Sequence, residues 1–86
     1  MTEKAQQIKD LIETAVDGAT VHMYDPDGEH FEAMVISETF IGLSLIKQHK
    51  LVMTALKERF ATDVHALALK TFTPEKWEKA KSRYGA

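Results

Sequence analysis

The sequence has no cysteine among its 86 residues. This absence excludes a disulfide framework, a zinc site with thiolate ligands and a cysteine nucleophile. Any metal chemistry must therefore rest on carboxylates and on the four histidines, which are His22, His30, His49 and His65. The N-terminus lacks a basic segment followed by an apolar run, and no apolar run is long enough to span a bilayer, so we expect a cytoplasmic protein without a membrane segment.

Recognisable catalytic motifs are also missing. The sequence contains no G-x-S-x-G, no Walker loop, no H-E-x-x-H and no paired carboxylates on a known scaffold. A chain of this length encloses one modest core, with little left to wall a deep cleft. We therefore expect a single domain, residues 1–86, that acts by binding a partner and is not an enzyme.

Charge is distributed unevenly along the chain, although the net charge is only −2. Nine of the 13 acidic residues precede Thr39, whereas nine of the 11 basic residues follow Glu38. Binding that depends on phosphate neutralisation usually requires a clear basic excess over the whole domain. The basic C-terminal half suits an acidic protein partner as well as it suits nucleic acid.

Hydrophobic spacing and turn residues predict six elements. An apolar stripe predicts a helix from Thr2 to about Gly18, followed by a hairpin with strands over residues 20–24 and 30–37. A long helix is capped by Ser44 and runs to about residue 61, a strand covers residues 64–71, and Thr73 caps a final helix with proline at its first position. The order αββαβα places the third strand parallel to the second, which predicts an α+β fold with a mixed three-stranded sheet packed against helices.

Side-chain orientations follow from the same spacing. Residues 40–43 form an apolar stretch that we assign to the core by default, with a docking surface as the alternative. Trp77 is expected to pack on the sheet, with basic residues around it in solvent. His49 is expected on the core side of the long helix, as a structural or interface histidine. The apolar positions of that helix are expected to share one face: Leu45, Ile46, Val52, Met53, Leu56 and Phe60.

Four segments, in this order, resemble the BolA-like family: Asp27-Gly28-Glu29-His30-Phe31-Glu32-Ala33, residues 37–44 (Ser-Glu-Thr-Phe-Ile-Gly-Leu-Ser), Gln48-His49-Lys50-Leu51-Val52, and residues 64–77 (Val-His-Ala-Leu-Ala-Leu-Lys-Thr-Phe-Thr-Pro-Glu-Lys-Trp). The resemblance extends from the hairpin to Trp77. It implies a class II KH-like fold, which agrees with the order of elements deduced from the hydrophobic spacing.

The resemblance also implies a partner and a cofactor. BolA-like proteins form a heterodimer with a cytosolic monothiol glutaredoxin, with or without a shared [2Fe-2S] cluster. In the cluster-bound form, the glutaredoxin cysteine and glutathione hold one iron, and the BolA-like protein supplies two ligands to the other. This implies a role in iron-sulfur trafficking or iron regulation, and we expect the isolated chain to be a monomer without a cofactor.

Two histidines are the candidate metal ligands. His65 matches the family histidine of the last strand, the principal cluster ligand, and neutral imidazole is a good ligand for iron. The second ligand in many members is a cysteine or histidine in the loop between the first two strands. Here that loop is short and cysteine-free, as in the short-loop subgroup, and His30 is the nearest candidate, the alternative being a solvated residue at the strand start. His22 ranks third.

A DNA-binding transcriptional regulator, acting in stress response or morphology, is the alternative function. It would use the KH-like or helix-turn-helix-like surface, in which the family commonly shows a histidine flanked by basic residues. The chain lacks the GXXG loop with which KH domains clamp RNA, and this argues against direct RNA binding. The residues expected on a partner or nucleic-acid surface are Lys47, His49, Lys50, Lys70, Lys76 and Lys79.

Overall fold

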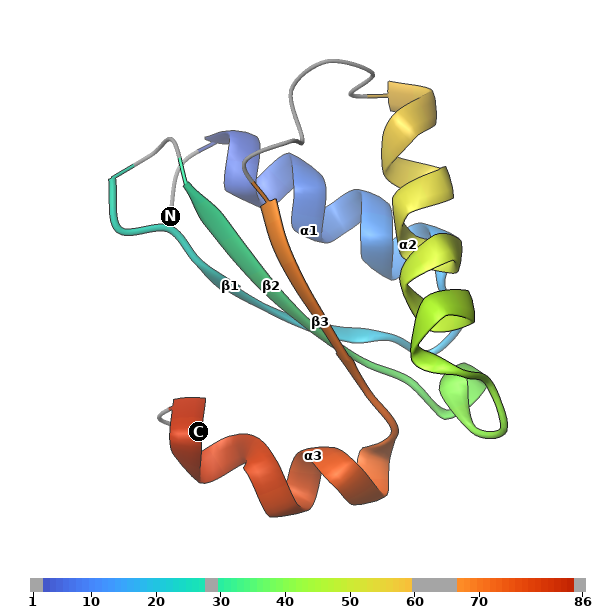
Figure 1. Cartoon of the computed structure of the whole chain (residues 1–86). Helices are drawn as coiled ribbons and strands as arrows, with labels where there is room; N and C mark the ends of the chain where they lie inside the picture. The colour runs from blue at the N-terminus through green and yellow to red at the C-terminus, as the bar shows by residue number, and fades with distance from the viewer. Residues whose placement is uncertain (1–2, 28–29, 60–66, 85–86) are drawn as a thin grey trace.

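The computed structural model describes residues 3–27, 30–59 and 67–84 (Figure 1). Its elements follow the predicted order αββαβα, with two short 3-10 helices in addition. The predicted cap at Thr2 and the predicted strand start at Val64 lie outside the described residues. The elements are α1 (Glu3–Ala15), β1 (Thr20–Tyr24), β2 (Phe31–Ile36), η1 (Glu38–Phe40), α2 (Leu45–Arg59), β3 (Leu67–Phe72), α3 (Pro74–Ala80) and η2 (Lys81–Tyr84).

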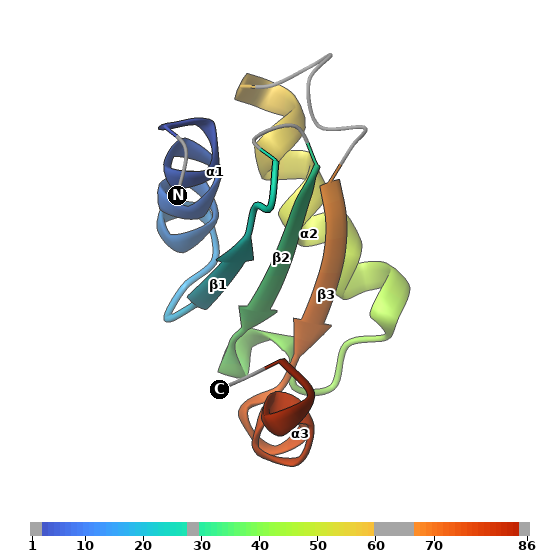
Figure 2. The ribbon, with the colours of Figure 1, turned by 90° about the vertical axis from the view of Figure 1, so that its left-hand side faces the viewer.

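The three strands form one mixed sheet in the order β1-β2-β3. β1 and β2 are antiparallel, with Val21 opposite Val35, and β3 is parallel to β2, with Leu67 opposite Phe31. Figure 2 shows the arrowheads of β2 and β3 pointing the same way and that of β1 pointing the opposite way. The predicted hairpin and the parallel third strand, which requires a crossover through α2, are both confirmed.

The main core lies between the sheet and the pair α1 and α2, which cover one face, here called the inner face (Figure 1). Alternate strand residues point to this face because side chains alternate along a strand. The apolar stripe of α1 packs on them, as predicted. The buried residues of this core are Ala5, Ile8, Ile12, Val16, Val21, Phe31, Ala33, Val35, Phe40, Val52 and Leu56.

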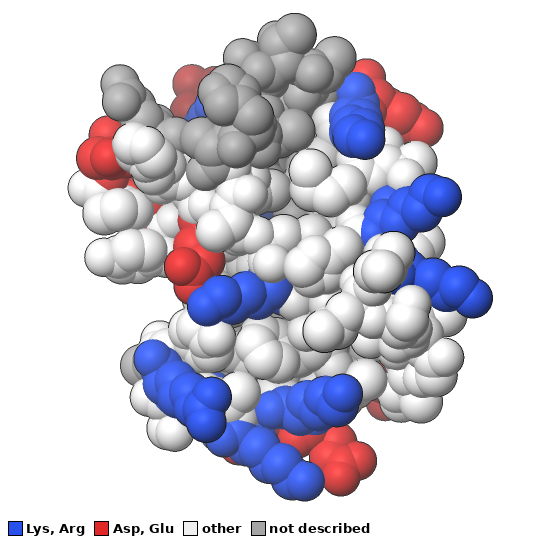
Figure 3. All heavy atoms as spheres, viewed as in Figure 1, with Lys and Arg blue, Asp and Glu red and all other residues white. Residues whose placement is uncertain are grey.

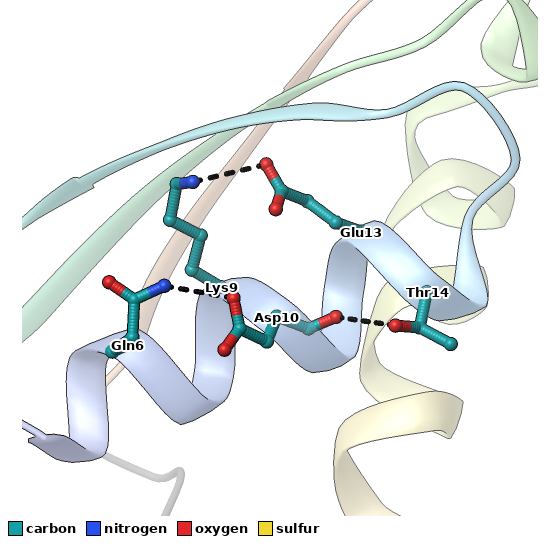
Figure 4. Close-up of polar contacts among 5 residues, drawn as sticks. All are labelled: Gln6, Lys9, Asp10, Glu13 and Thr14. Carbon is teal, nitrogen blue, oxygen red and sulfur yellow. Dashed lines mark hydrogen bonds and ion pairs between the residues drawn. The ribbon is translucent and has the colours of Figure 1, made fainter.

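α1 carries polar side chains that are linked by contacts one helical turn apart (Figure 4). The Gln6 amide donates to Asp10 Oδ1 over 2.8 Å, and Lys9 Nζ lies 3.2 Å from Glu13 Oε2. The Thr14 hydroxyl donates to the Asp10 carbonyl over 2.8 Å. The two side-chain pairs, Gln6 with Asp10 and Lys9 with Glu13, stabilise the helix modestly. None of the helices in the described ranges has the length and apolar character that a bilayer span requires.

α3 lies on the opposite, outer face of the sheet (Figure 1). Thr73 caps it, because its hydroxyl accepts from the backbone N–H of Lys76, and Pro74 occupies the first turn, as predicted. Trp77 is buried on the sheet next to Phe72, with ring centroids 5.2 Å apart. This small second core consists of Met34, Ile36 and Trp77, flanked by Phe72 and Tyr84.

The prediction that the apolar residues of α2 share one buried face is wrong for the first turn of the helix. Val52 and Leu56 are fully buried, but Leu45 is 62% exposed and Ile46 is 80% exposed. Leu45 precedes Val52 by two turns and points in nearly the same direction, so its exposure means that the inner core does not extend to this first turn. Phe60 lies outside the described residues.

Gln48, one turn before Val52, is a buried polar residue of α2. Its amide nitrogen donates to the carbonyls of Phe40 (3.3 Å) and Leu43 (2.9 Å), and its carbonyl accepts from the Thr71 hydroxyl over 2.6 Å. The side chain thereby joins β3 to the loop that leads into α2. In that loop Gly42 has φ +83°, a left-handed conformation that favours glycine.

Candidate functional site

His30 lies at the exit of the turn between β1 and β2 and is bonded to Asp27. Its ring Nδ1 is 2.8 Å from Asp27 Oδ2, and its backbone N–H donates to Asp27 Oδ1, also over 2.8 Å. The His30 side chain is 71% exposed. Both contacts close the turn over three residues, so the carboxylate of Asp27 fixes the orientation of the ring on an otherwise accessible side chain.

A carboxylate on one imidazole nitrogen is the arrangement that commonly orients a metal-binding histidine. With the proton on Nδ1, His30 donates to Asp27, and Nε2 is the nitrogen with ligand character. Phe31, the next residue, pairs with Leu67, the first residue of β3. His30 therefore lies at the end of the sheet where β3 begins.

His65, the principal ligand expected from the sequence, lies outside the described residues. It precedes Leu67, the first described residue of β3, by two positions in the chain. Within residues 3–27, 30–59 and 67–84, no three histidine or carboxylate side chains gather into a group that could hold a metal. The assignment of His65 and His30 as ligands stays a prediction.

His22, the third candidate, belongs to the outer face of the sheet. Its imidazole stacks on Trp77 with ring centroids 5.1 Å apart and planes 20° apart. Its register partner is Met34, in the middle of β2, whereas Tyr24 pairs with Glu32 at the hairpin end. The structure thus places His22 in an aromatic cluster with α3, away from the turn that holds His30.

The segment that leads into α2 exposes three large apolar side chains. Ile41, Leu45 and Ile46 are 64%, 62% and 80% exposed, and we call these three residues the α2-entry surface. Phe40, in the same apolar stretch, is fully buried, so the expected core assignment holds for Phe40 and not for Ile41. Exposed aliphatic side chains that form one patch commonly mark an interaction site.

Lys47, His49 and Lys50, three residues expected on a partner or nucleic-acid surface, come next along α2. Lys47 and Lys50 are exposed, whereas His49 is half-buried. The Lys47 backbone N–H is 3.3 Å from the Ser44 hydroxyl, which confirms Ser44 as the cap of α2. Lys47 and Lys50 therefore place two positive charges on α2 directly after Leu45 and Ile46.

The other three expected surface lysines lie elsewhere. Lys76 lines a hollow that also includes Ile41, and Lys79 forms an exposed ion pair with Glu75 at 3.7 Å. Lys70 projects from β3 on the outer face. Figure 3 shows Lys and Arg side chains over α3 and along α2, and a further blue side chain beside a red one over the sheet between these two groups.

Lys70 links β3 to the C-terminal 3-10 helix. Its Nζ donates to the Tyr84 hydroxyl over 3.2 Å, lies 5.0 Å from the centroid of that ring, and is 3.8 Å from Glu32 Oε1. The hydrogen bond to Tyr84, followed by the negative charge of Glu32, raises the pKa of Lys70 above its usual 10.5. Both contacts favour the charged ammonium.

Comparison with known proteins assigns the chain to a family. A family model described as BolA-like protein matches residues 4–76. The chain belongs to the BolA-like family. This BolA-like chain is 30% identical over 80 residues to the acid stress protein IbaG of Escherichia coli (strain K12), covering 92% of this chain and 94% of that protein.

A solved structure matches over most of its length, and two further sequence relatives match over shorter segments. A BolA protein homologue from Coxiella burnetii has a solved structure with 40% identity and a TM-score of 0.74, covering 91% of this chain and 97% of that one. The DNA-binding transcriptional regulator BolA of Escherichia coli (strain K12) is 39% identical over 49 residues, 57% of this chain and 47% of the regulator. BolA-like protein 1 of Bos taurus is 44% identical over 59 residues, 67% of this chain and 44% of that protein. This BolA-like chain thus matches less than half the length of these last two relatives.

Two features of this region were not predicted from the sequence. The burial of Gln48 is indicated by its spacing, because it lies four and eight residues before Val52 and Leu56 and so on the same buried face of α2. The hydrogen bond from the His30 backbone N–H to Asp27 is also indicated by the sequence, because aspartate in a turn commonly bonds to nearby backbone N–H groups. Nothing in the sequence indicates that the His30 ring also contacts this carboxylate.

Proposed function

We propose that this BolA-like chain is a non-enzymatic partner of a cytosolic monothiol glutaredoxin and shares a [2Fe-2S] cluster with it. In this proposal His65 and His30 ligate one iron, and the glutaredoxin cysteine and glutathione hold the other. The proposed role is iron-sulfur trafficking or iron regulation in the cytoplasm. The proposal starts from family membership, and the observation that carries it furthest is the Asp27–His30 pair.

The Asp27–His30 pair supports the choice of His30 as the second ligand. The carboxylate lies 2.8 Å from Nδ1 and orients the ring at the end of the sheet where β3 begins. His65 stands two residues before β3 in the sequence, so the proposal brings two imidazoles to one end of the sheet. Two nitrogen ligands on one iron raise the reduction potential of a cluster over that of an all-thiolate one.

The α2-entry surface supports binding of a protein partner. Its three aliphatic side chains are mostly exposed, and Lys47 and Lys50 follow them on α2. An apolar centre with a charged rim is typical of protein interfaces. The lysines would favour a partner that is acidic around its docking site, and would mainly raise the rate of encounter.

The experiment mixes the purified chain with a monothiol glutaredoxin that carries its glutathione-ligated cluster. Elution volume reports the heterodimer, and visible absorption and circular dichroism report the surroundings of the cluster. We expect a heterodimer with a changed cluster spectrum. A mixture that elutes as separate proteins with an unchanged spectrum would reject the proposal.

Matched histidine variants separate the ligand assignment from complex formation. We expect His65→Ala to abolish the spectral change and His30→Ala to alter it, because each removes a nitrogen ligand. His49→Ala is the control, since this half-buried histidine of α2 is not a proposed ligand. If the His65→Ala complex gave the wild-type spectrum, His65 would not be a ligand.

DNA binding is the second candidate, and one relative carries the name of a DNA-binding transcriptional regulator. Here it would depend on phosphate contacts from Lys47 and Lys50 on α2. A salt series tests this, because each phosphate contact changes the slope of log affinity against log salt by about one. Replacing both lysines with glutamine should lower the slope by about two. An unchanged slope would exclude this surface.

A further inference from the structure

A second candidate site lies on the outer face of the sheet, where α3 and η2 cover only one end (Figure 1). Here a hollow of about 620 Å³ opens between β1, β2 and the C-terminal helices. This volume lies within the range of small-ligand sites. We call it the outer hollow; the residues used in the argument are His22, Tyr24, Glu32, Trp77, Arg83 and Tyr84.

Flat rings form much of its wall. The planes of Trp77 and Tyr84 are 20° apart with centroids 5.8 Å apart, and those of His22 and Trp77 are also 20° apart. Tyr24 adds a ring that is 60% exposed. Aromatic rings bind other flat rings by offset stacking, so a planar ligand that extends this stack is favoured over a bulky one.

Two charged groups on the wall have hydrogen-bonding capacity left for a ligand. Glu32 Oε1 is 3.8 Å from Lys70 Nζ, which is longer than a hydrogen bond. The Arg83 side chain is exposed and makes no hydrogen bond or ion pair with the described residues. The hollow thus offers a carboxylate that can accept from a ligand N–H and a guanidinium that can donate to an anion.

The local charge favours an acidic ligand group. Lys70 lies beside the hollow, with its ammonium on the hydroxyl and over the ring of Tyr84. Together with Arg83 it outweighs the single negative charge of Glu32. A cationic ligand would have to compete with Lys70 for the Tyr84 ring, whereas an anionic group would be attracted by both positive charges.

We propose that the outer hollow binds a small planar heteroaromatic compound with an amino group and an acidic group, the chemistry of a nucleoside monophosphate. The ring lies against His22 and Tyr84, the amino group donates to Glu32, and the acidic group pairs with Arg83. This site goes beyond the proposed glutaredoxin role and requires neither the cluster nor the partner. A failure of one proposal is therefore distinguishable from a failure of the other.

Trp77 is the only tryptophan of the chain and lines the hollow, so its fluorescence reports binding there. The probes are AMP, GMP, adenosine and inorganic phosphate, each added to the full chain alone. We expect a saturable change with at least one nucleotide, and affinity at least about tenfold lower for adenosine, which lacks the charged group that would pair with Arg83. No saturable change with either nucleotide up to about 1 mM, a weak-binding limit, would overturn the proposal.

Two variants and a control test the assigned contacts. We expect Arg83→Ala to weaken nucleotide binding about tenfold, because it removes a charge-assisted hydrogen bond, and Glu32→Gln to weaken it several-fold, because it replaces a charged acceptor by a neutral one. Lys79→Ala is the control: it removes one positive charge from α3 at a side chain that is 78% exposed and does not line the hollow. Equal losses in Arg83→Ala and Lys79→Ala would mean nonspecific attraction and would overturn the proposal, as would adenosine binding as tightly as AMP.

Discussion

The Thr71 hydroxyl donates to Gln48 Oε1 over 2.6 Å, and this buried hydrogen bond joins β3 to α2. The amide nitrogen of the same glutamine donates to the carbonyls of Phe40 and Leu43. One side chain therefore satisfies three polar groups behind the α2-entry surface. Burying such groups without partners is costly, so this glutamine fixes the loop as well as the helix.

Gln48→Ala should destabilise the protein by about 3 kcal/mol, because it leaves the buried Thr71 hydroxyl and the part-buried Leu43 carbonyl without this partner and opens a cavity. Urea denaturation followed by circular dichroism measures the free energy of unfolding. Thr54→Ala, an exposed substitution in the same helix, should change it by less than about 0.5 kcal/mol. A similar small change in both variants would contradict the assigned network.

Trp77→Ala should cost about 3 kcal/mol of stability, since the indole is buried on the sheet against Phe72 and His22. Thermal denaturation followed by circular dichroism measures the loss. Glu78→Ala, the neighbouring exposed residue, should stay within about 0.5 kcal/mol of the parent chain. A Trp77→Ala protein as stable as the parent would mean that α3 does not depend on this contact.

Ile46→Ser should leave the free energy of unfolding within about 0.5 kcal/mol of the parent value, because the side chain is 80% exposed. The same variant should weaken glutaredoxin binding several-fold, as measured by titration calorimetry, if the α2-entry surface is the docking site. Thr54→Ser, also exposed on α2, should leave the affinity unchanged. Parent-like binding by Ile46→Ser would place the partner elsewhere.

The charge of Lys70 should persist at higher pH than that of an ordinary lysine. Its pKa is raised above 10.5 by Tyr84 and then by Glu32, so its contribution to stability is fully present below pH 10.5 and is lost as pH rises through the folded-state pKa. NMR titration of the lysine side chain measures this. Tyr84→Phe should lower the pKa more than Glu32→Gln does. A pKa that neither substitution changes would contradict the described contacts.

How far the sequence predicted this fold depends on what each pattern encodes. Periodicity gives the direction of a side chain around its helix. For Ile8 and Ile12 of α1, this direction alone correctly predicts that both are buried. It does not say how far the core extends along the helix axis. Leu45 and Val52 share a direction but differ in burial, and only the tertiary arrangement separates them.

The candidate site was less predictable than the fold. The sequence places His30 at the start of a strand, but it does not reveal that Asp27 contacts both its ring and its backbone. Similarly, it suggests that Trp77 packs on the sheet without revealing that His22 stacks on it. Such contacts arise from turn geometry and from strand register, which bring together residues that are not neighbours in the pattern.

Pulsed electron paramagnetic resonance of the reduced cluster tests the central claim most directly. Only this chain carries ¹⁵N-labelled histidine, so every labelled nitrogen coupled to the cluster belongs to it. We expect two strongly coupled histidine nitrogens in the glutaredoxin complex, with one lost in His30→Ala, the other lost in His65→Ala, and both kept in His22→Ala. A complex that shows no coupling to labelled histidine would contradict the shared-cluster account.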